Sequence, residues 1–307
     1  MKNTPRTGIT THQETLELAK DAAGQSFPAS SCSRSSVIRG DCRTVLADMP
    51  AESVQCCVTS PPYWGLRDYG HADQIGLEST PEAFVEMLTG VFREVRRVMK
   101  ADGTLWLNMG DTYNNRRRLR STSHQPSLNG REEKSWAEMA KEGKTRMTVT
   151  HDGWKEKDLM GIPWMVAQAL RADGWYLRQE IIWQKSFGKP EPTRDRLPTR
   201  HESIFLLSKS KNYLFNRDAL PAWAKDSVWK IPPTGRSDHG ASFAEKLPLA
   251  SILAGSHPND VVLDPFAGSG TTGRVASQIG RHAWMIELND DYANLCKNSL
   301  VSPQNEQ

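Results

Sequence analysis

Short apolar runs and amphipathic stretches alternate along the chain, a pattern that predicts strands followed by helices. Residues 54–59 form an apolar run that predicts a buried strand. Residues 81–100 place an apolar side chain at every third or fourth position, which predicts a helix with Pro81 in its first turn. The apolar residues of 103–111 predict another strand, and this succession of strand, helix and strand favours a parallel sheet.

The alternation begins with a short strand near Val37 and continues to the C-terminal region. Further apolar stretches predict a helix, two strands and two strand-loop-helix units, at residues 163–174, 176–184, 203–209 and 260–300. Together these elements predict one α/β domain over residues 37–300. We expect a doubly wound, mostly parallel sheet with helices on both faces.

Three polar segments interrupt or flank this pattern. Residues 1–36 have little apolar surface to bury and predict a poorly ordered N-terminal arm. Residues 112–158 are polar and rich in arginine, and they predict an inserted basic loop. Residues 186–240 combine a charged turn with a connector that contains proline and tryptophan.

Composition excludes several classes of protein. The 307 residues are 37% hydrophobic, enough for a sizeable core, and their net charge of +3 does not by itself indicate a nucleic-acid partner. The five cysteines lack C-x-x-C spacing, which argues against a disulfide framework or a structural zinc site. We find no apolar signal core and no window near the ~20 apolar residues of a membrane span, so we expect a cytoplasmic protein without a membrane partner.

A glycine-rich turn follows the apolar strand at residues 261–264. Gly268, Gly270 and Gly273 have the spacing G-x-G-x-x-G, and a helix is expected to open at Thr271. Such a turn allows a ligand to approach the backbone closely, and the free N–H groups of the helix can hold an anionic group. Glu287 ends the next strand, where a carboxylate can accept from ribose hydroxyls. A tight turn without a ligand, or the nucleotide site of a dehydrogenase, has the same pattern.

The segment CVTSPPYWGLRDYG, residues 57–70, places two prolines and two aromatic residues at the end of the first buried strand. The prolines fix the backbone, so the Pro61 carbonyl and the Ser60 hydroxyl form a rigid pair of acceptors. A Pro-Pro pair after a strand is also common as a plain rigid turn.

TSPPYW at residues 59–64 and LDPFAGSGTT at residues 263–272 resemble the two hallmark motifs of the S-adenosylmethionine-dependent DNA amino-methyltransferases. These enzymes modify the exocyclic amine of cytosine at N4 or of adenine at N6. The catalytic motif comes first here, which is similar to the permuted beta class. Further similarity covers most of residues 37–300, including RHESIFLLSKSKNY at 200–213. The resemblance implies the methyltransferase type of doubly wound sheet, with permuted motif order.

The resemblance also implies roles for individual residues. The catalytic tetrapeptide would be Ser60, Pro61, Pro62 and Tyr63. S-adenosyl-L-methionine would be held by Asp41, Asp264, Pro265, Phe266, Gly268, Ser269, Gly270, Thr271 and Glu287. Asp41 would accept from the adenine amine of the cofactor, or it would cap the helix that follows it. The chemistry needs no metal.

Methyl transfer to an exocyclic amine needs hydrogen-bond acceptors and an aromatic side chain close to the target base. The lone pair of an exocyclic amine is delocalised into its ring, and acceptors aimed at the amine hydrogens localise it again. The target base must be flipped out of double-stranded DNA and stacked on an aromatic surface, for which Tyr63 is the expected platform and Trp64 the second candidate. Methyl transfer is then an in-line displacement that depends on positioning.

Contacts with DNA are expected from the basic segments, although charge runs are also common in solvated loops. The candidate residues lie in the insert at about 112–158 and in the possible DNA-contacting segment at about 186–240: Arg116, Arg117, Arg118, Arg120, Arg194 and Arg196.

Several functions compete with one another. Serine at position 60 favours N4-cytosine over N6-adenine, since the adenine enzymes of this family more often carry Asp or Asn there. No cysteine follows a proline, so cytosine-C5 methylation through a thiolate has no candidate nucleophile. RNA or protein-glutamine methyltransferases usually present the clamp after Asn and in the opposite motif order. A non-catalytic DNA-binding protein with a cofactor-shaped fold is a further alternative. A cognate restriction endonuclease is a candidate partner.

Overall fold

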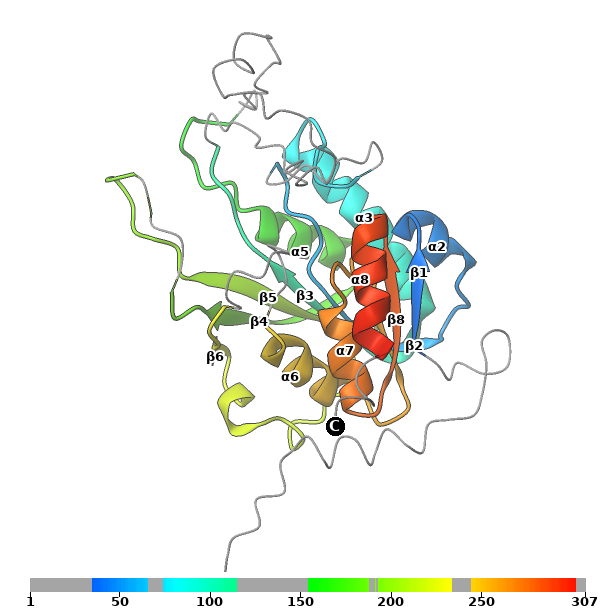
Figure 1. Ribbon diagram of the computed structural model, residues 1–307. Coiled ribbons are helices and arrows are strands. Elements are labelled where there is room, and N and C mark those ends of the chain that lie inside the picture. Colours follow the sequence, from blue (N-terminus) through cyan, green and yellow to red (C-terminus); the bar gives the residue numbers. More distant parts are fainter. Residues whose placement is uncertain are drawn as a thin grey trace, which may run out of the picture.

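The computed structural model describes residues 35–65, 74–114, 154–187, 191, 193–233 and 244–301. Their centre is an eight-stranded sheet with the order β1-β8-β7-β2-β3-β5-β4-β6 (Figure 1). The strands are β1 (Ser36–Arg39), β2 (Val54–Thr59), β3 (Met99–Met109), β4 (Tyr176–Gln184), β5 (His201–Ser208), β6 (Val228–Lys230), β7 (Val261–Asp264) and β8 (His282–Glu287).

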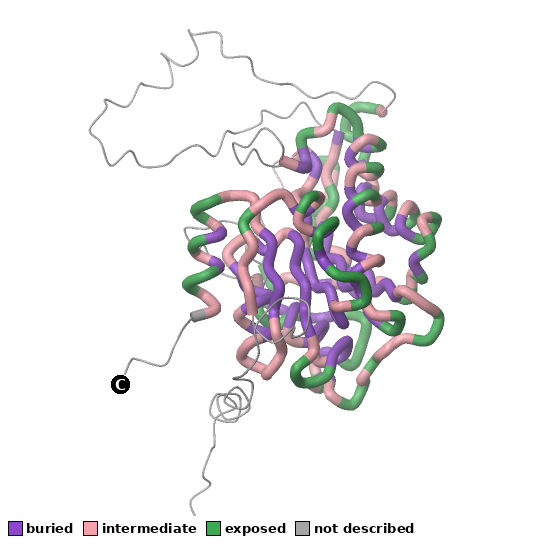
Figure 2. The backbone as a smooth tube through the Cα atoms, turned by 90° about the vertical axis from the view of Figure 1, so that its right-hand side faces the viewer, coloured by how far each residue is buried: buried purple, intermediate pink, exposed green. Residues whose placement is uncertain are grey.

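Helices cover both faces of this sheet. One hydrophobic cluster packs α2 (Cys42–Asp48), α3 (Pro81–Val98) and α5 (Ile162–Ala172) against one face. A second cluster packs α6 (Lys246–Gly255), α7 (Thr271–Gln278) and α8 (Asp290–Val301) against the other, together with the short 3-10 helix η2 (Ala222–Ala224). The central strands are buried between these layers (Figure 2). The expected doubly wound α/β sheet is therefore confirmed.

The direction of the strands brings distant segments to one edge of the sheet. β1, β8, β7, β2 and β3 are parallel neighbours, so their carboxyl ends share an edge, which we call the carboxyl edge. β5 is antiparallel to β3 and to β4, so β5 begins at this edge and β4 ends there. The described parts of four connections therefore lie at the carboxyl edge: residues 59–63, 110–114, 185–187 with 193–200, and 264–270.

Most strand and helix predictions are confirmed, and the differences have physical reasons. β2 and β4 occupy the predicted residues, whereas β3 begins at Met99, before the polar residues Lys100 to Asp102 that the apolar pattern excluded. α6 was not predicted as a helix, because it is apolar on every side and has no helical periodicity. The three-residue β6 is too short for a period of two to be detected.

The two ends of the predicted insert lie side by side. The amide of Asn114 donates to the Asp158 carbonyl at 2.8 Å, and the amide of Lys157 donates back to the Asn114 carbonyl at 2.8 Å. Residues 115–153 lie outside the described residues. The predicted arm of residues 1–36 is described only from Ser35, whose Oγ accepts from the Ala283 amide at 3.0 Å, and Ser36 already belongs to β1.

In the described part of the chain, no helix is long and apolar enough to cross a membrane. The same residues contain no group of three or more His, Cys, Asp or Glu side chains suited to a metal ion. Four cysteines are described, and all are buried thiols: Cys42, Cys56, Cys57 and Cys296.

Gly255 marks the closest approach of α6 to the sheet and gives a test of this packing. A Cβ atom there would lie 2.4 Å from Thr104 Oγ1, 3.0 Å from Cys56 Sγ and 3.1 Å from Trp106 Nε1. We expect Gly255→Ala to lower the free energy of unfolding by about 1–3 kcal/mol through overpacking. Urea unfolding followed by circular dichroism measures the change.

Gly90 supplies the matched control, because it is exposed in α3 and an added Cβ would meet nothing within 4 Å. Gly90→Ala is expected to stabilise the protein by roughly 0.5–1 kcal/mol through helix propensity. If Gly255→Ala and Gly90→Ala changed the free energy of unfolding equally, the close contact of α6 with the sheet would be contradicted.

Candidate functional site

The carboxylate of Asp264 connects the ends of β2 and β7 to the start of α7. Oδ1 accepts from Thr59 Oγ1 at 2.6 Å and from the Phe266 amide at 3.1 Å, and Oδ2 accepts from Thr272 Oγ1 at 2.8 Å. Only 1% of Asp264 is exposed, and this burial raises the pKa of its carboxyl to about 6. The structure thus directs this predicted cofactor residue into the protein, where its carboxylate supports the turn.

The glycine-rich turn has the backbone geometry that its sequence predicts. Gly268 (φ +53°) and Gly270 (φ +83°) adopt the left-handed conformation that favours glycine. A Cβ at Gly270 would lie 2.6 Å from both Cys296 Sγ and Ser299 Oγ, so α8 leaves no room for a side chain there. A Cβ at Gly268 would meet nothing within 4 Å, so the backbone is open on that side.

The remaining residues of the turn surround this opening. Phe266 is half-buried, and its ring lies edge-on to that of Phe92 at 6.5 Å between centroids. Pro265 and Thr271 are buried, while Ser269 is half-buried. The first turn of α7 has N–H groups that its own helix cannot satisfy, which suits a polar ligand at this place.

Glu287 lies at the end of β8 beside this turn, as predicted. Its Oε2 accepts from the Gly268 amide at 2.8 Å, and its Oε1 accepts from the Asn289 amide at 2.9 Å. Burial raises the pKa of its carboxyl above the ordinary value. Each carboxylate oxygen keeps a second lone pair, so the group can still accept from a ligand hydroxyl.

Asp41 stands next to Glu287, because the Gly40 amide donates to the Glu287 carbonyl at 3.0 Å. Its side chain caps α2 by accepting from the Arg43 amide at 2.9 Å, and it also forms an ion pair with the Arg43 guanidinium. The helix-capping alternative for Asp41 is therefore confirmed. Its side chain remains 24% exposed.

The Ser-Pro-Pro-Tyr segment continues directly from β2 at the carboxyl edge. Ser60 Oγ donates to the Tyr63 hydroxyl over a long 3.4 Å, and the Tyr63 hydroxyl donates to Glu202 Oε2 at 2.9 Å. Pro61 is buried, whereas Ser60, Pro62 and Tyr63 are half-buried. Trp64 is only 5% exposed and donates to the Glu78 carbonyl, so this ring is part of the core and not a stacking platform.

Sequence reasoning did not identify the acidic partner of Tyr63. Glu202 is the second residue of β5, and its carboxylate also accepts from Asn108 Nδ2 at 3.3 Å and forms an ion pair with Lys185. In the sequence, this residue is only a glutamate near the start of an apolar strand. It reaches Tyr63 because β5 runs antiparallel to β3, and the sequence pattern does not specify that direction.

The predicted DNA-contacting arginines separate into three groups. Arg196 is mostly buried, pairs with Glu191 at 2.9 Å, and lies 3.7 Å from the centroid of the Tyr113 ring. This pairing holds the pKa of Glu191 at about 2 and engages the Arg196 cation within the protein. Arg194 on the same turn is exposed. The arginines of the insert lie outside the described residues: Arg116, Arg117, Arg118 and Arg120.

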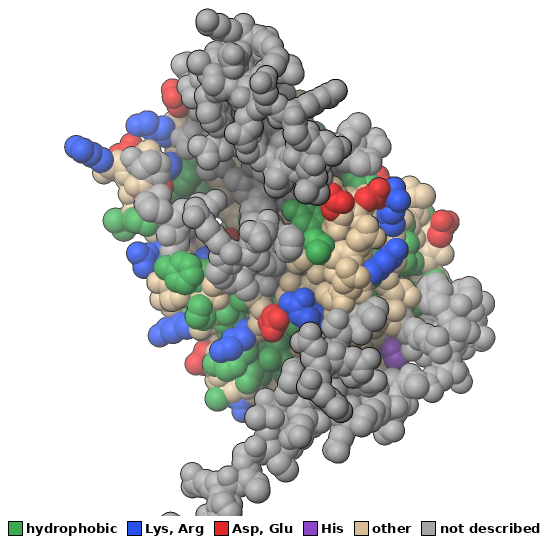
Figure 3. All heavy atoms as spheres, in the orientation of Figure 1, with side chains coloured by type: hydrophobic (Ala, Val, Ile, Leu, Met, Phe, Trp, Pro, Cys, Tyr) green, Lys and Arg blue, Asp and Glu red, His purple; other side chains and the backbone are tan. Residues whose placement is uncertain are grey.

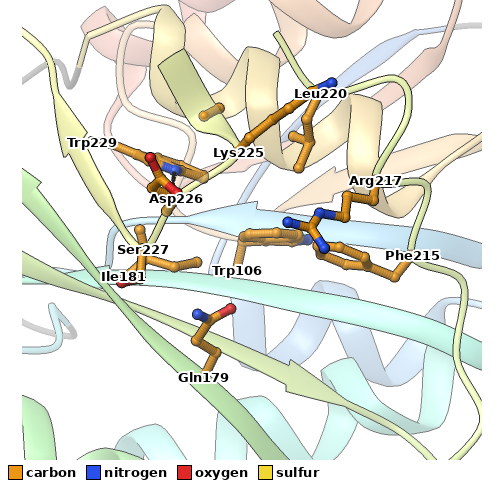
Figure 4. A pocket seen from close by; sticks show the side chains of 11 residues that line it. Trp106, Gln179, Ile181, Phe215, Arg217, Leu220, Lys225, Asp226, Ser227 and Trp229 are labelled. Atoms are coloured by element: carbon orange, nitrogen blue, oxygen red, sulfur yellow. Dashed lines mark hydrogen bonds between the residues drawn. The ribbon is translucent and has the colours of Figure 1, made fainter. Parts of the chain in front are cut away.

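A separate pocket of about 270 Å³ lies on the α6 side of the sheet (Figure 4). Its wall includes Trp106, Phe215 and Trp229. The Trp106 ring stacks on the other two, at 6.3 Å from Phe215 and 6.1 Å from Trp229 between ring centroids. Arg217 and Lys225 also line it, and it contains none of the predicted catalytic or cofactor residues.

The buried carboxyl of Asp264 predicts a pH dependence of stability. Its folded pKa of about 6 lies above the ordinary value of 3.8, so its contribution to stability is lost as the pH rises between these values. Asp264→Asn removes this titration. Between pH 4 and pH 7 the free energy of unfolding should therefore shift in favour of the variant by roughly 2 kcal/mol, at about 1.4 kcal/mol per pKa unit.

Denaturant unfolding at several pH values measures this shift, with the exposed Asp102→Asn as the control for loss of a charge. A difference between wild type and Asp264→Asn that does not vary with pH would show that burial does not raise the pKa of this carboxyl.

Comparison with known proteins agrees with this arrangement. The family model described as DNA methylase, of the N6 and N4 type, matches residues 54–298. The Type II methyltransferase M.SmaI of Serratia marcescens is 42% identical over 281 residues, covering 86% of this chain and 90% of that protein.

Two solved structures have a similar fold. One is a DNA modification methylase of Thermus thermophilus complexed with S-adenosyl-L-methionine, with a TM-score of 0.61, 28% identity, and coverage of 87% of this chain and 93% of that one. The other is the cytosine-N4-specific PvuII DNA methyltransferase, with a TM-score of 0.66, 19% identity and 89% coverage of both chains. The chain therefore belongs to the N6/N4 DNA methylase family, and it is a type II, S-adenosylmethionine-dependent DNA methyltransferase.

Proposed function

We propose that this enzyme methylates cytosine at N4 in double-stranded DNA. The observation that carries the proposal is Ser60, a half-buried hydroxyl at the carboxyl edge beside the rigid Pro61 carbonyl. Two fixed acceptors of this kind localise the amine lone pair and hold the nitrogen for in-line attack on a methyl group. Tyr63 is proposed as the platform on which the flipped base stacks.

The residues around the glycine-rich turn fit the methyl donor. S-adenosyl-L-methionine, when bound, supplies an electrophilic methyl group on a sulfonium. We propose that the open backbone at Gly268, the half-buried Phe266 and the first turn of α7 receive it. Glu287 would accept from its ribose hydroxyls, and the part of Asp41 that remains exposed would accept from its adenine amine. Asp264 would act indirectly, by holding the turn.

Methylation of adenine at N6 is the alternative, because the same acceptor pair serves either amine. Serine in the first position of the tetrapeptide favours cytosine, as described above. We further propose that the enzyme acts in the cytoplasm together with a cognate restriction endonuclease, whose DNA sites it would protect.

Removal of the Ser60 hydroxyl tests the proposal. We expect Ser60→Ala to lower the rate of methyl transfer by at least about 100-fold while binding of S-adenosylmethionine is unchanged, because only an acceptor to the amine is lost. Nucleoside mass spectrometry of unmethylated DNA after incubation should detect N4-methylcytosine with the wild type. Ser210→Ala is the control, because Ser210 follows β5 at the opposite edge of the sheet, where its hydroxyl donates to the Asn212 carbonyl.

N6-methyladenine in this assay would overturn the choice of base and keep the site. Measurable cofactor binding without any methylated nucleoside would contradict the proposed function itself.

DNA contact is proposed for Arg194, the exposed arginine on the turn that follows β4 at the carboxyl edge. The turn is braced by Lys157, which pairs with Asp195 at 2.9 Å, and by Arg196 on Tyr113. In Figure 3, Lys and Arg side chains are scattered over the visible face among acidic ones, so a local contact matters more than a single patch.

We expect Arg194→Ala to weaken DNA binding and to reduce the slope of log affinity against log salt concentration by about 1, the effect of one lost phosphate contact. Fluorescence anisotropy with a labelled duplex at several salt concentrations measures the slope. Lys211→Ala, an exposed cation after β5 at the opposite edge, should leave the slope unchanged. The same slope in wild type and Arg194→Ala would remove this arginine from the interface.

A further inference from the structure

A chain of hydrogen bonds leads from the proposed acceptor into a charged pair behind it. Ser60 Oγ donates to the Tyr63 hydroxyl at 3.4 Å, and Tyr63 donates to Glu202 Oε2 at 2.9 Å. Glu202 comes from β5 and is separated from Tyr63 by 139 positions in the sequence. The end of this chain is therefore brought to the site by the fold and not by the local motif.

Two further donors hold the Glu202 carboxylate. Lys185 at the end of β4 forms an ion pair with Oε1, and Asn108 Nδ2 on β3 donates to Oε2 at 3.3 Å. The Lys185 and Glu202 side chains are only 20% and 16% exposed, so water competes little with this pair. The Lys185 ammonium also lies 4.4 Å from the centre of the Trp183 ring. Donors from both neighbouring strands thus fix the carboxylate in place.

The chemistry of these groups fixes the direction of the chain. A carboxylate can only accept, so the Tyr63 hydrogen must point to Glu202. Burial and, after it, the Glu202 charge raise the pKa of the Tyr63 hydroxyl well above the ordinary value, so Tyr63 stays protonated. The Tyr63 oxygen is then free to accept the Ser60 hydrogen. Ser60 is left with lone pairs, which are what an amine hydrogen requires.

Close backbone packing holds the middle of the chain. A Cβ at Gly110 would lie 2.8 Å from Cε2 of Tyr63 and 3.4 Å from Cγ and Cδ of Glu202. The glycine lets the ring and the carboxylate rest together on the backbone that follows β3. Lateral movement of either group is restricted by this contact.

We propose that the Lys185–Glu202 pair is a positioning device that sets the polarity of the Tyr63 and Ser60 hydroxyls, so that Ser60 presents an acceptor to the target amine. Glu202 is a positioning residue, since it acts through Tyr63 and does not touch the base. The inference rests on the proposed amine methyltransferase function and assigns to it residues outside the Ser-Pro-Pro-Tyr motif.

Glu202→Gln tests the device, because it preserves size but removes the negative charge and replaces one of the two acceptor oxygens with an NH2 donor. We expect the rate of methyl transfer in a single turnover to fall about 10- to 100-fold, the range for a misplaced reacting group, with the KM for DNA and the Kd for S-adenosylmethionine unchanged. Tyr63→Phe, which loses only one oxygen and keeps the ring, should show a similar loss. The double variant should be no slower than the slower single variant, because both changes break one chain.

Glu180→Gln is the matched control. Glu180 is a carboxylate on the adjacent β4 that accepts from Ser203 Oγ at 2.7 Å. Since this contact does not lead to Tyr63, the Glu180→Gln variant should transfer methyl groups at the rate of the wild type.

A spectroscopic measurement separates positioning from general damage. Tyrosinate absorbance, taken as the difference from a Tyr63→Phe counterpart, reports the ionisation of Tyr63 alone. Its pKa should be lower in Glu202→Gln than in the wild type, because the neighbouring negative charge is gone.

The outcomes distinguish the inference from the function on which it rests. If the wild type methylates DNA and Glu202→Gln transfers at the same rate, or the two single losses multiply in the double variant, the inference is overturned and the function stands. If the wild type transfers no methyl group to any DNA, the proposed function fails and the inference falls with it.

Discussion

The Asp264 carboxylate is the constraint on which the site depends. It accepts hydrogen bonds from the last residue of β2, from the glycine-rich turn and from α7, so it connects segments that are 205 positions apart. Burial of a carboxylate is costly, and these three donors offset part of the cost. Because Thr59 directly precedes Ser60, one buried group sets the position of the glycine-rich turn relative to the acceptor segment.

The other acidic residues at the carboxyl edge brace loops in the same way. Asp111 at the end of β3 accepts from the amides of Gly161 and Ile162 at 3.0 and 3.1 Å and so caps α5 across the insert. Glu287 holds the Gly268 amide, and Asp41 caps α2. Each of these three carboxylates thus fixes the element beside it. Glu202 differs from them, because the partners of its carboxylate oxygens are the side chains of Tyr63, Asn108 and Lys185 and not backbone amides.

The sequence predicts those parts of the site that are local in the chain. Ser60 to Tyr63 and Gly268 to Gly270 can be identified because rigid prolines and left-handed glycines leave a pattern in neighbouring residues. The sequence alone is compatible with two roles for Asp41, a helix cap or a ligand contact, and the structure shows the cap.

Glu202 and Lys185 could not be assigned from the sequence. These residues come close to Tyr63 because β5 runs antiparallel between β3 and β4. Hydrophobic periodicity does not show the direction of a strand. The same reason explains Arg196, whose basic character suggested a surface contact. In the folded chain Arg196 forms an ion pair with Glu191 and lies over the Tyr113 ring, so its charge is already paired within the protein. The net charge of +3 does not indicate where DNA binds, and which cations are already paired can be seen only in the folded chain.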